Sequence, residues 1–549
     1  MSGPVYCILA GGTVHCVPVT AFSSTNEETP KELSHSPQIN PLPDRAQLPI
    51  LRSPVNLAIK RKNLLYTLNN PSLSDLESDV SRRLSNDGSR PNSKVKNGHS
   101  DMPPVHVSNK LSRPKPGIMN LDAEQVSDSD DEAADLTLAV LQNYSTHAVY
   151  LPQFSVDLKG NLDSDYSQIK TLLSKVFPSW SAPIKVKQLT GGITNMLLSC
   201  SHEATNETLL IRVYGQGTNL IIDRNREFVS HLMLNSLDLA PSIHARFENG
   251  LIYGFLPGRS LDPNELANKY VYPLIAQQLG NWHNSINCEY IEDGVSTLRK
   301  YTASLKKSAE SSLLPKSKEG KAAKVPKSIN NIWDLIEEWI RIVPQIEALA
   351  SVFGENTENT HVTTENVREV VQQEFEWLKK ALKHATRSPI VVSHCDLLSG
   401  NIIVPDSKEF AKRCAEGDAE LPPLSENPIQ FIDYEYMLPA PRAFDIANHF
   451  AEWQGFDCNR SAIPDPSPLN PVMVKWCKGY LNNLKALKDE VGALIHEIAC
   501  YYGMPGFYWG IWAIIQSELS TIDFNYAEYG KSRLEEYWLW KKKFEYLIL

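Results

Sequence analysis

The feature that most constrains this 549-residue chain is the uneven distribution of its large aromatic side chains. All 11 tryptophans lie at or after Trp180, whereas residues 1–135 contain only Tyr6, Phe22 and Tyr66 as aromatic residues. Most of this segment is rich in Ser, Pro, Asn and charge, and it cannot bury enough apolar area to offset the conformational entropy that ordering costs. We therefore predict a mostly disordered N-terminal extension over 1–135 and a folded core that follows it.

Charge and cysteine content argue against several classes of protein. Acidic residues outnumber basic ones 64 to 54, a balance that disfavours a nucleic-acid partner, since such binding calls for a basic surface. The nine cysteines include no CxxC pair, so they indicate neither a disulfide framework nor a zinc site. The N-terminus lacks a basic segment before its short apolar stretch, and no apolar run reaches the length of a membrane span. We predict a cytoplasmic protein without stable membrane insertion.

Apolar periodicity predicts strands first and helices later, an α+β fold. Strands are predicted at Ile184–Leu189, Met196–Cys200, Leu209–Tyr214 and Leu251–Phe255, and helices at Arg226–Leu234, Tyr272–Asn284 and Trp333–Leu349. The first three strands read as an antiparallel meander. This order predicts a small β-rich lobe over 136–260 and a larger helical lobe over 261–549. A Lys/Ser-rich insertion at 306–328 is predicted to be a flexible exposed loop, with a basic patch for membrane lipid as the alternative.

The strongest chemical signal is the spacing HxDxxxxN between two apolar, strand-like runs. It is formed by His394, Asp396 and Asn401. In phosphoryl transfer from a nucleotide, an aspartate orients the acceptor hydroxyl and takes its proton, and an asparagine shortly after it can bind the metal that bridges the phosphates. Alone, the pattern is equally compatible with an ordinary polar loop. We predict Asp396 as the catalytic base and Asn401 as a metal ligand.

A second motif strengthens the interpretation of HxDxxxxN as a phosphoryl-transfer loop. The apolar run at 429–432 ends in Asp433 and Glu435, where protein kinases carry the magnesium-binding aspartate. Magnesium prefers carboxylate and amide oxygens, so Asp433 together with Asn401 predicts a Mg²⁺ site, with a strand-end cap as the plainer role for Asp433. No Ala-Pro-Glu motif follows, and this favours a small-molecule acceptor over a protein.

Upstream residues are suited to hold the phosphates of ATP. Glycines between two strands let backbone N–H groups approach phosphate oxygens, although a two-glycine turn is more often a simple hairpin. Arg212 lies on an apolar strand where a kinase carries its phosphate-contacting lysine, and Glu227 follows on the next helix as its ion-pair partner; either could instead be a surface charge. The predicted nucleotide-binding residues are Gly191, Gly192, Ile193, Thr194, Asn195, Arg212 and Glu227.

Taken together, these motifs resemble the choline/ethanolamine kinase family over residues 140–549. The resemblance is carried by GGITNMLL, LLIRVYG, LIIDRNREF, SHCDLLSGNII, FIDYEY, AFDIANHFAEW and FYWGIWAIIQSELSTIDF. Several of these look more like the ethanolamine branch, of fungal type, than the choline branch. The resemblance implies a two-lobed protein-kinase-like fold, Mg·ATP as donor, and phosphorylation of the ethanolamine hydroxyl as the first step of the CDP-ethanolamine route to phosphatidylethanolamine. It also implies a homodimer.

The acceptor is a cation, which carboxylates and aromatic faces attract. Trp509 and Trp512 are three residues apart on a predicted helix and share a face, which by spacing alone indicates core packing. Similarity to the family places Glu452, Trp509, Trp512 and Tyr529 on positions that line the choline pocket of choline kinases. Asp457 stands where those enzymes tend to carry an aromatic residue, and this departure favours ethanolamine.

Three further residues are predicted to support the site without touching substrate: His394, Glu435 and Asp445. Asp445 opens an apolar-patterned helix and could cap it or brace the catalytic loop. Two alternatives to an ethanolamine kinase remain. One is a choline kinase or a dual enzyme. The other is a pseudokinase scaffold, which would be expected to have lost Asp396, Asn401 or Asp433; all three are present.

Overall fold

A computed structural model describes residues 5–10, 13–18, 148–157, 166–180, 183–189, 195–215, 218, 221–312, 329–357, 361–417, 420–520 and 522–548. The chain divides into two compact units, Met1–Asp101 and Met102–Leu549. The first contains an antiparallel hairpin of β1 (Val5–Ala10) and β2 (Thr13–Pro18). The remainder of the predicted extension over 1–135 lies outside the described residues. All elements below belong to the second unit.

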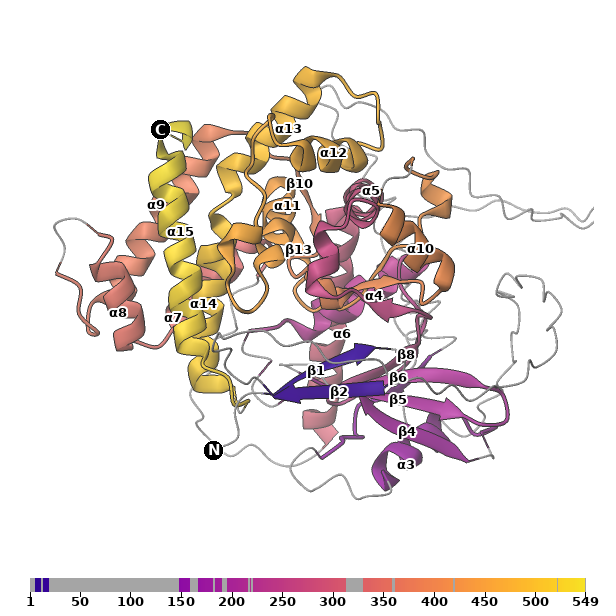
Figure 1. Cartoon of the computed structure of the whole chain (residues 1–549). Helices are drawn as coiled ribbons and strands as arrows, with labels where there is room; N and C mark the ends of the chain where they lie inside the picture. The colour runs from indigo at the N-terminus through magenta and orange to yellow at the C-terminus, as the bar shows by residue number, and fades with distance from the viewer. Residues whose placement is uncertain are drawn as a thin grey trace, which may run out of the picture. The chain divides into compact units, whose positions relative to one another are not determined.

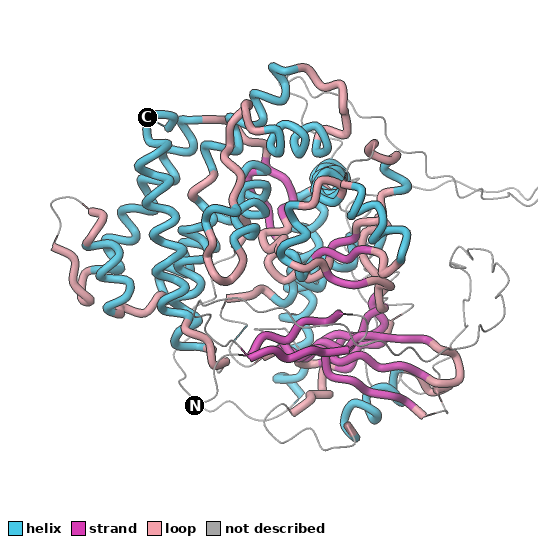
Figure 2. The backbone as a smooth tube through the Cα atoms, in the orientation of Figure 1, coloured by secondary structure: helices cyan, strands magenta, loops and turns pink. Residues whose placement is uncertain are grey.

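A six-stranded sheet forms the smaller lobe of the second unit (Figures 1 and 2). Its strands are β3 (Val149–Leu151), β4 (Ile184–Leu189), β5 (Asn195–His202), β6 (Glu207–Tyr214), β7 (Ile243–Phe247) and β8 (Gly250–Gly254). Their order is β3-β7-β8-β6-β5-β4, with β3 parallel to β7 and every other pair antiparallel. The predicted meander of β4, β5 and β6 is therefore confirmed.

The alternation of side chains along β6 decides what each face of the sheet does. Leu209, Ile211 and Val213 point to one face and pack in a core with helix α3 (Ser167–Val176). Arg212 belongs to the opposite face, together with helix α4 (Arg224–Ser236). The side chain of Arg212 is therefore directed toward α4 and away from the apolar core between the sheet and α3.

Helices dominate the larger lobe, as Figure 2 shows. They are α5 (Val271–Ser285), α6 (Cys288–Ser312), α7 (Ile332–Ile342), α8 (Glu347–Gly354), α9 (Val367–Ala385), α10 (Lys408–Glu416), α11 (Arg442–Ala451), α12 (Pro471–Tyr480), α13 (Lys488–Tyr501), α14 (Met504–Leu519) and α15 (Tyr526–Ile548). Their apolar faces share one continuous core, which also includes side chains of α4. Within the described residues, no helix has the length and apolar character needed to cross a bilayer.

Two small sheets inside the helical lobe carry the loops with the predicted chemistry. One pairs β10 (Ile390–Ser393) with β13 (Leu438–Pro441), and the other joins β12 (Gln430–Phe431), β11 (Ile402–Val404) and β9 (Arg259–Ser260). Asp396 lies in the loop from β10 to β11. Because β12 pairs with β11, the backbone N–H of Ile432 donates to the carbonyl of Asn401 at 3.0 Å. This pairing brings the predicted metal ligands Asn401 and Asp433 next to one another.

Two sequence-based expectations need correction. The helix predicted over Trp333–Leu349 is two helices, α7 and α8, because Pro344 lacks an N–H and disfavours the helical conformation of Val343 before it. The insertion predicted to be a loop over 306–328 is helical at 306–312, since α6 continues to Ser312, and residues 313–328 lie outside the described part of the chain.

Candidate functional site

The loop that carries Asp396 is held by a buried carboxylate from α11. Asp445 accepts the backbone N–H groups of His394 and Cys395, both at 2.8 Å, and lies 2.9 Å from Nε2 of His283. Cys395 has a φ of 63°, in the left-handed region that non-glycine residues rarely adopt. Asp445 thus braces a strained turn directly before Asp396. It does not cap α11, whose N-cap is Pro441.

Two more side chains of α11 extend this support. The amide of Asn448 donates to the carbonyl of Cys395 at 2.9 Å and accepts from the indole N–H of Trp509 at 2.8 Å. His449 Nδ1 donates to the carbonyl of Leu397 at 2.9 Å. Because these residues follow Asp445 at helical spacing, one helix face fixes both sides of the predicted base. The imidazole of His394 links this loop to the segment after β12, with Nε2 donating to the carbonyl of Ile432 at 3.0 Å.

Asp396 lies in a strongly acidic environment. Asn401 donates through Nδ2 to the backbone oxygen of Asp396 at 2.8 Å and to its carboxylate at 3.0 Å. Burial raises the pKa of Asp396 well above its ordinary value, and the carboxylates of Asp433, Glu452 and Glu435 raise it further. These three carboxylates therefore lie within electrostatic reach of Asp396, and the site as a whole is built to attract positive charge.

The predicted pairing of Arg212 with Glu227 is present, at 3.2 Å. The same guanidinium nitrogen contacts Asp433 at 2.7 Å and lies 3.8 Å from Glu435. Burial lowers the pKa of Arg212, but the surrounding carboxylates, Asp433 foremost, outweigh burial and hold it well above the ordinary value. Arg212 is therefore a permanent cation at the junction of the two lobes.

A second arginine, Arg224, belongs to the same cluster and was missed by the sequence analysis. It contacts Glu227 and Glu435 and donates to Asn195 and Thr218. Its sequence neighbours gave no signal for this role, because the partners come from distant segments. The other predicted nucleotide-binding residues, Gly191–Thr194, lie outside the described residues.

The donor atoms beside Asp396 suit a nucleotide-bound magnesium ion. Asn401 uses its amide nitrogen to contact Asp396, which leaves its side-chain oxygen free of hydrogen bonds to described residues. The Asp433 carboxylate is 25% exposed. Within the described ranges, no group of three or more His, Cys, Asp or Glu residues forms a self-sufficient metal site. Such sparse protein ligation is typical of Mg²⁺, which takes its remaining ligands from phosphates and water.

The predicted amine-binding residue Glu452 belongs to a buried charge cluster that involves α15. Its carboxylate accepts from Arg533 at 3.2 Å, and Arg533 also contacts Glu536 at 3.1 Å and donates to the hydroxyl of Tyr529 at 2.8 Å. One guanidinium faces two carboxylates, so the cluster keeps one negative charge. Burial raises the pKa of Glu452, and Arg533 opposes this increase. Arg533 and Glu536 were not predicted.

Aromatic rings form a continuous series from Trp509 to Tyr529. Trp509 and Trp512 meet edge to face with ring centroids 5.4 Å apart, and Trp512 contacts Tyr526 at 6.0 Å. Phe524 links Tyr526 at 4.8 Å to Tyr529 at 5.6 Å. Both tryptophans are buried, and their indole N–H groups donate to Asn448 and to the hydroxyl of Tyr436.

The residue before Asp457 places an aromatic ring beside Tyr529. Asp457 is exposed, and it is the preceding residue, Phe456, whose ring lies 6.2 Å from that of Tyr529 and 6.4 Å from that of Phe524. An aromatic side chain is therefore present at this edge of the series.

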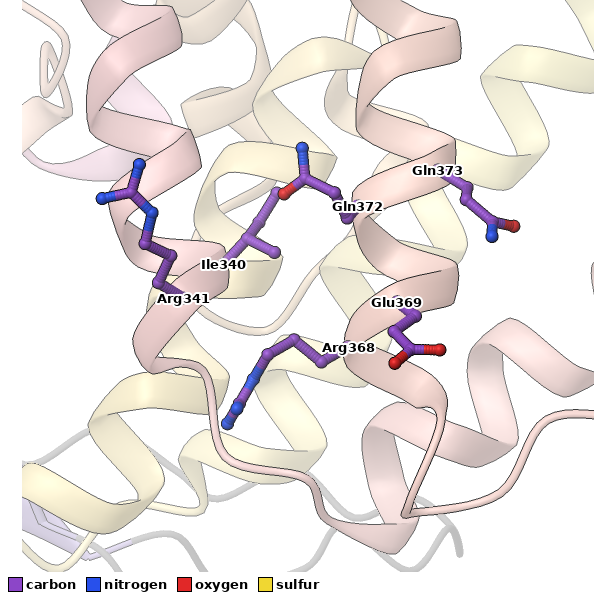
Figure 3. A pocket seen from close by; sticks show the side chains of 6 residues that line it. All are labelled: Ile340, Arg341, Arg368, Glu369, Gln372 and Gln373. Atoms are coloured by element: carbon purple, nitrogen blue, oxygen red, sulfur yellow. The ribbon is translucent and has the colours of Figure 1, made fainter.

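A separate hollow of about 440 Å³ lies between α7 and α9 (Figure 3). It is lined by Ile340, Arg341, Arg368, Glu369, Gln372 and Gln373. None of the predicted site residues lines it. Its two cations already have partners, since Arg341 contacts Glu338 and Arg368 donates to the carbonyl of Val343. The predicted catalytic and metal-binding residues lie elsewhere, in the loops beside β10, β11 and β12.

The arrangement of sheet, helices and loops is similar to that of a solved kinase. The solved structure of a Plasmodium vivax ethanolamine kinase covers 76% of this chain and 96% of its own, with a TM-score of 0.52 and 23% sequence identity. With the aspartate-bearing loop between two short strands, this likeness defines a two-lobed protein-kinase-like fold, as the sequence predicted.

Sequence comparison narrows the class to one family. A model of the choline/ethanolamine kinase family matches residues 186–538, well over half of the chain. The chain belongs to this family. Mouse ethanolamine kinase 1 is 29% identical over 382 residues, which span 68% of this chain and 88% of the relative. Human ethanolamine kinase 1 is 30% identical over 382 residues, 68% of this chain and 71% of the relative.

Proposed function

We propose that this protein is an ethanolamine kinase that transfers the γ-phosphoryl group of ATP to the hydroxyl of ethanolamine. The observation that carries the proposal is the position of Glu452. Its carboxylate lies in a buried cluster with one net negative charge, and it follows by about one turn Asn448, whose side chain donates to the carbonyl of Cys395 next to Asp396. A short acceptor with an ammonium at one end and a hydroxyl at the other matches two such carboxylates. The names of the mouse and human relatives support the same substrate.

In the proposed reaction, Asp396 accepts the hydroxyl proton while the substrate oxygen forms a bond to the γ-phosphorus. The bond from that phosphorus to the bridging oxygen breaks, and ADP leaves. The Asp396 environment suits this role because the raised pKa makes the carboxylate a stronger base. Asp445 and Asn448 hold the loop so that little reorganisation is needed.

Asn401 and Asp433 would hold Mg²⁺, which neutralises charge on the phosphates when bound. The guanidinium of Arg212 would then lie beside the phosphates, and its ion pair with Glu227 would keep it in that orientation. Residues Gly191–Thr194 are proposed to contact the phosphates through backbone N–H groups. Positioning and charge neutralisation would supply most of the acceleration, since the protein is asked for little covalent chemistry.

The proposed product, phosphoethanolamine, would feed the CDP-ethanolamine route to phosphatidylethanolamine. We further propose a cytoplasmic homodimer, which the family resemblance supports. A choline kinase, or an enzyme that accepts both amino alcohols, is the second candidate, because the aromatic series from Trp509 to Tyr529 could also face a quaternary ammonium.

Turnover by an Asp396→Asn variant tests the proposed chemistry. The asparagine keeps the size and hydrogen-bonding ability of the side chain but cannot take a proton at neutral pH, so ethanolamine-dependent ADP formation should be lost while the melting temperature is kept. Asp262→Asn is a matched control, because this carboxylate accepts the backbone N–H of Asn264 as the cap of a short 3₁₀ helix at Pro263–Ala267. Retained turnover in Asp396→Asn would contradict the assignment of the base.

A further inference from the structure

Arg224, at the first position of α4, joins segments that are far apart in the sequence. Its Nη1 donates to Glu227 at 2.9 Å and to Glu435 at 2.8 Å. Its Nη2 donates to Asn195 at 3.0 Å and to Thr218 at 2.7 Å. One side chain therefore links β5, the segment before α4, α4 itself, and the segment that follows β12 in the helical lobe.

Burial and several contacts hold the Arg224 side chain in one orientation. Its side chain is 11% exposed, and its guanidinium lies 4.0 Å from the centre of the Tyr214 ring, a cation–π contact. Asn195, which accepts from Arg224, also donates to Glu435 at 2.8 Å, so the three residues form a closed triangle. The Glu435 side chain is only 4% exposed. Each member of the triangle thus fixes the other two.

Arg212 and Arg224 each bridge the lobes through a carboxylate of the segment after β12, and these two bridges differ in one respect. Arg212 pairs with Asp433, which is a proposed magnesium ligand, so a bound metal would compete with Arg212 for that carboxylate. Arg224 pairs with Glu435, and neither residue is a proposed ligand. The Arg224–Glu435 bridge can therefore persist during turnover, even when a bound metal takes Asp433 away from Arg212.

We propose that Arg224 is a positioning residue that holds β5 and α4 in register with the Asp433 segment and thereby sets the affinity of the enzyme for nucleotide. The inference rests on the proposed function in one respect, namely that Mg·ATP binds at this junction. Without Arg224, Glu227 and Glu435 would be two buried carboxylates with one fewer counter-ion, and their repulsion would push the lobes apart. Lysine would keep the charge but not the fork that reaches four acceptors.

The test is the affinity for the non-hydrolysable ATP analogue AMP-PNP with Mg²⁺, measured by calorimetry without any amino alcohol. Arg224→Met should raise Kd about tenfold or more, because breaking a buried ion pair removes several contacts at once, and Arg224→Lys should fall between this variant and wild type. The KM for ethanolamine at saturating ATP should stay within about twofold, since Arg224 makes no contact with the Glu452 cluster.

Arg226→Met is the matched control. Arg226 is a buried arginine on the same turn of α4, but it pairs with Glu292 of α6 and the carbonyl of Ile329. Its loss should lower the melting temperature and leave the AMP-PNP Kd unchanged. If Arg224 had a merely structural role, Arg224→Met would likewise lower the melting temperature and leave the AMP-PNP Kd unchanged.

The inference is overturned if the AMP-PNP Kd stays within about twofold of wild type in Arg224→Lys and Asn195→Ala, two milder changes that remain informative if Arg224→Met does not fold. Failure of the proposed function would look different. In that case the wild-type enzyme would not turn over ethanolamine, whereas its AMP-PNP Kd and the difference between the Arg224 and Arg226 variants would still be measurable.

Discussion

Replacement of Glu452 by glutamine should weaken binding of the amino alcohol without unfolding the protein. The side chain is 9% exposed, so water screens its charge poorly. A hydrogen bond to a charged partner is worth about 1.5 to 3 kcal/mol, and about 1.4 kcal/mol corresponds to a factor of ten. The KM for ethanolamine should therefore rise roughly 10- to 100-fold, with a smaller change in kcat.

The cluster explains why the fold should survive this change. Arg533 would still contact Glu536 at 3.1 Å and donate to Tyr529 at 2.8 Å, so its buried charge keeps a partner. The assay is ADP formation at saturating Mg·ATP over a range of ethanolamine concentrations. Glu497→Gln is the matched control, because this equally buried carboxylate pairs with Arg442 at 2.7 Å and should affect stability only. An unchanged KM in Glu452→Gln would refute the placement of the ammonium.

Three further predictions follow from the same geometry. Burial raises the pKa of Glu452 above its ordinary 4.5, so the carboxylate is charged above that raised pKa and becomes neutral as pH falls through it. The KM for ethanolamine should therefore rise on acidification, at a pH above the ordinary glutamate value. This rise should be absent in Glu452→Gln. Asp445→Asn cannot accept two backbone N–H groups equally well, so it should lower stability by about 1 to 3 kcal/mol in denaturant titrations and reduce kcat; an unaltered kcat would contradict the bracing role. Gly506→Ala would place a Cβ 2.5 Å from the carbonyl oxygen of Arg533, where α14 meets α15, and should lower the melting temperature, whereas Gly492→Ala enters open space and should not.

The sequence predicted those parts of the fold that local patterns determine. The strand over Ile184–Leu189 was predicted with its exact bounds, because alternation and flanking residues define it locally. The break between α7 and α8 was missed although Pro344 signalled it, since apolar spacing was read across the proline.

The site was predictable where its residues form contiguous motifs. His394, Asp396 and Asn401 share one loop, and their spacing carried the hypothesis. Arg224 and Arg533 could not be found in this way, because their roles depend on partners contributed by distant elements. The contact of Phe456 with Tyr529 could not be predicted for a similar reason: which of two adjacent residues faces Tyr529 depends on the local turn, and residue type alone does not determine it.

Turnover of ethanolamine and choline by the purified full-length enzyme with Mg·ATP tests most directly whether ethanolamine is the phosphoryl acceptor. Specificity is the ratio of the two kcat/KM values, best obtained by direct competition. We expect a clear preference for ethanolamine, because a primary ammonium donates hydrogen bonds to the Glu452 carboxylate and a quaternary one cannot. A preference for choline would contradict this expectation, and absence of turnover on both would exclude an amino-alcohol kinase.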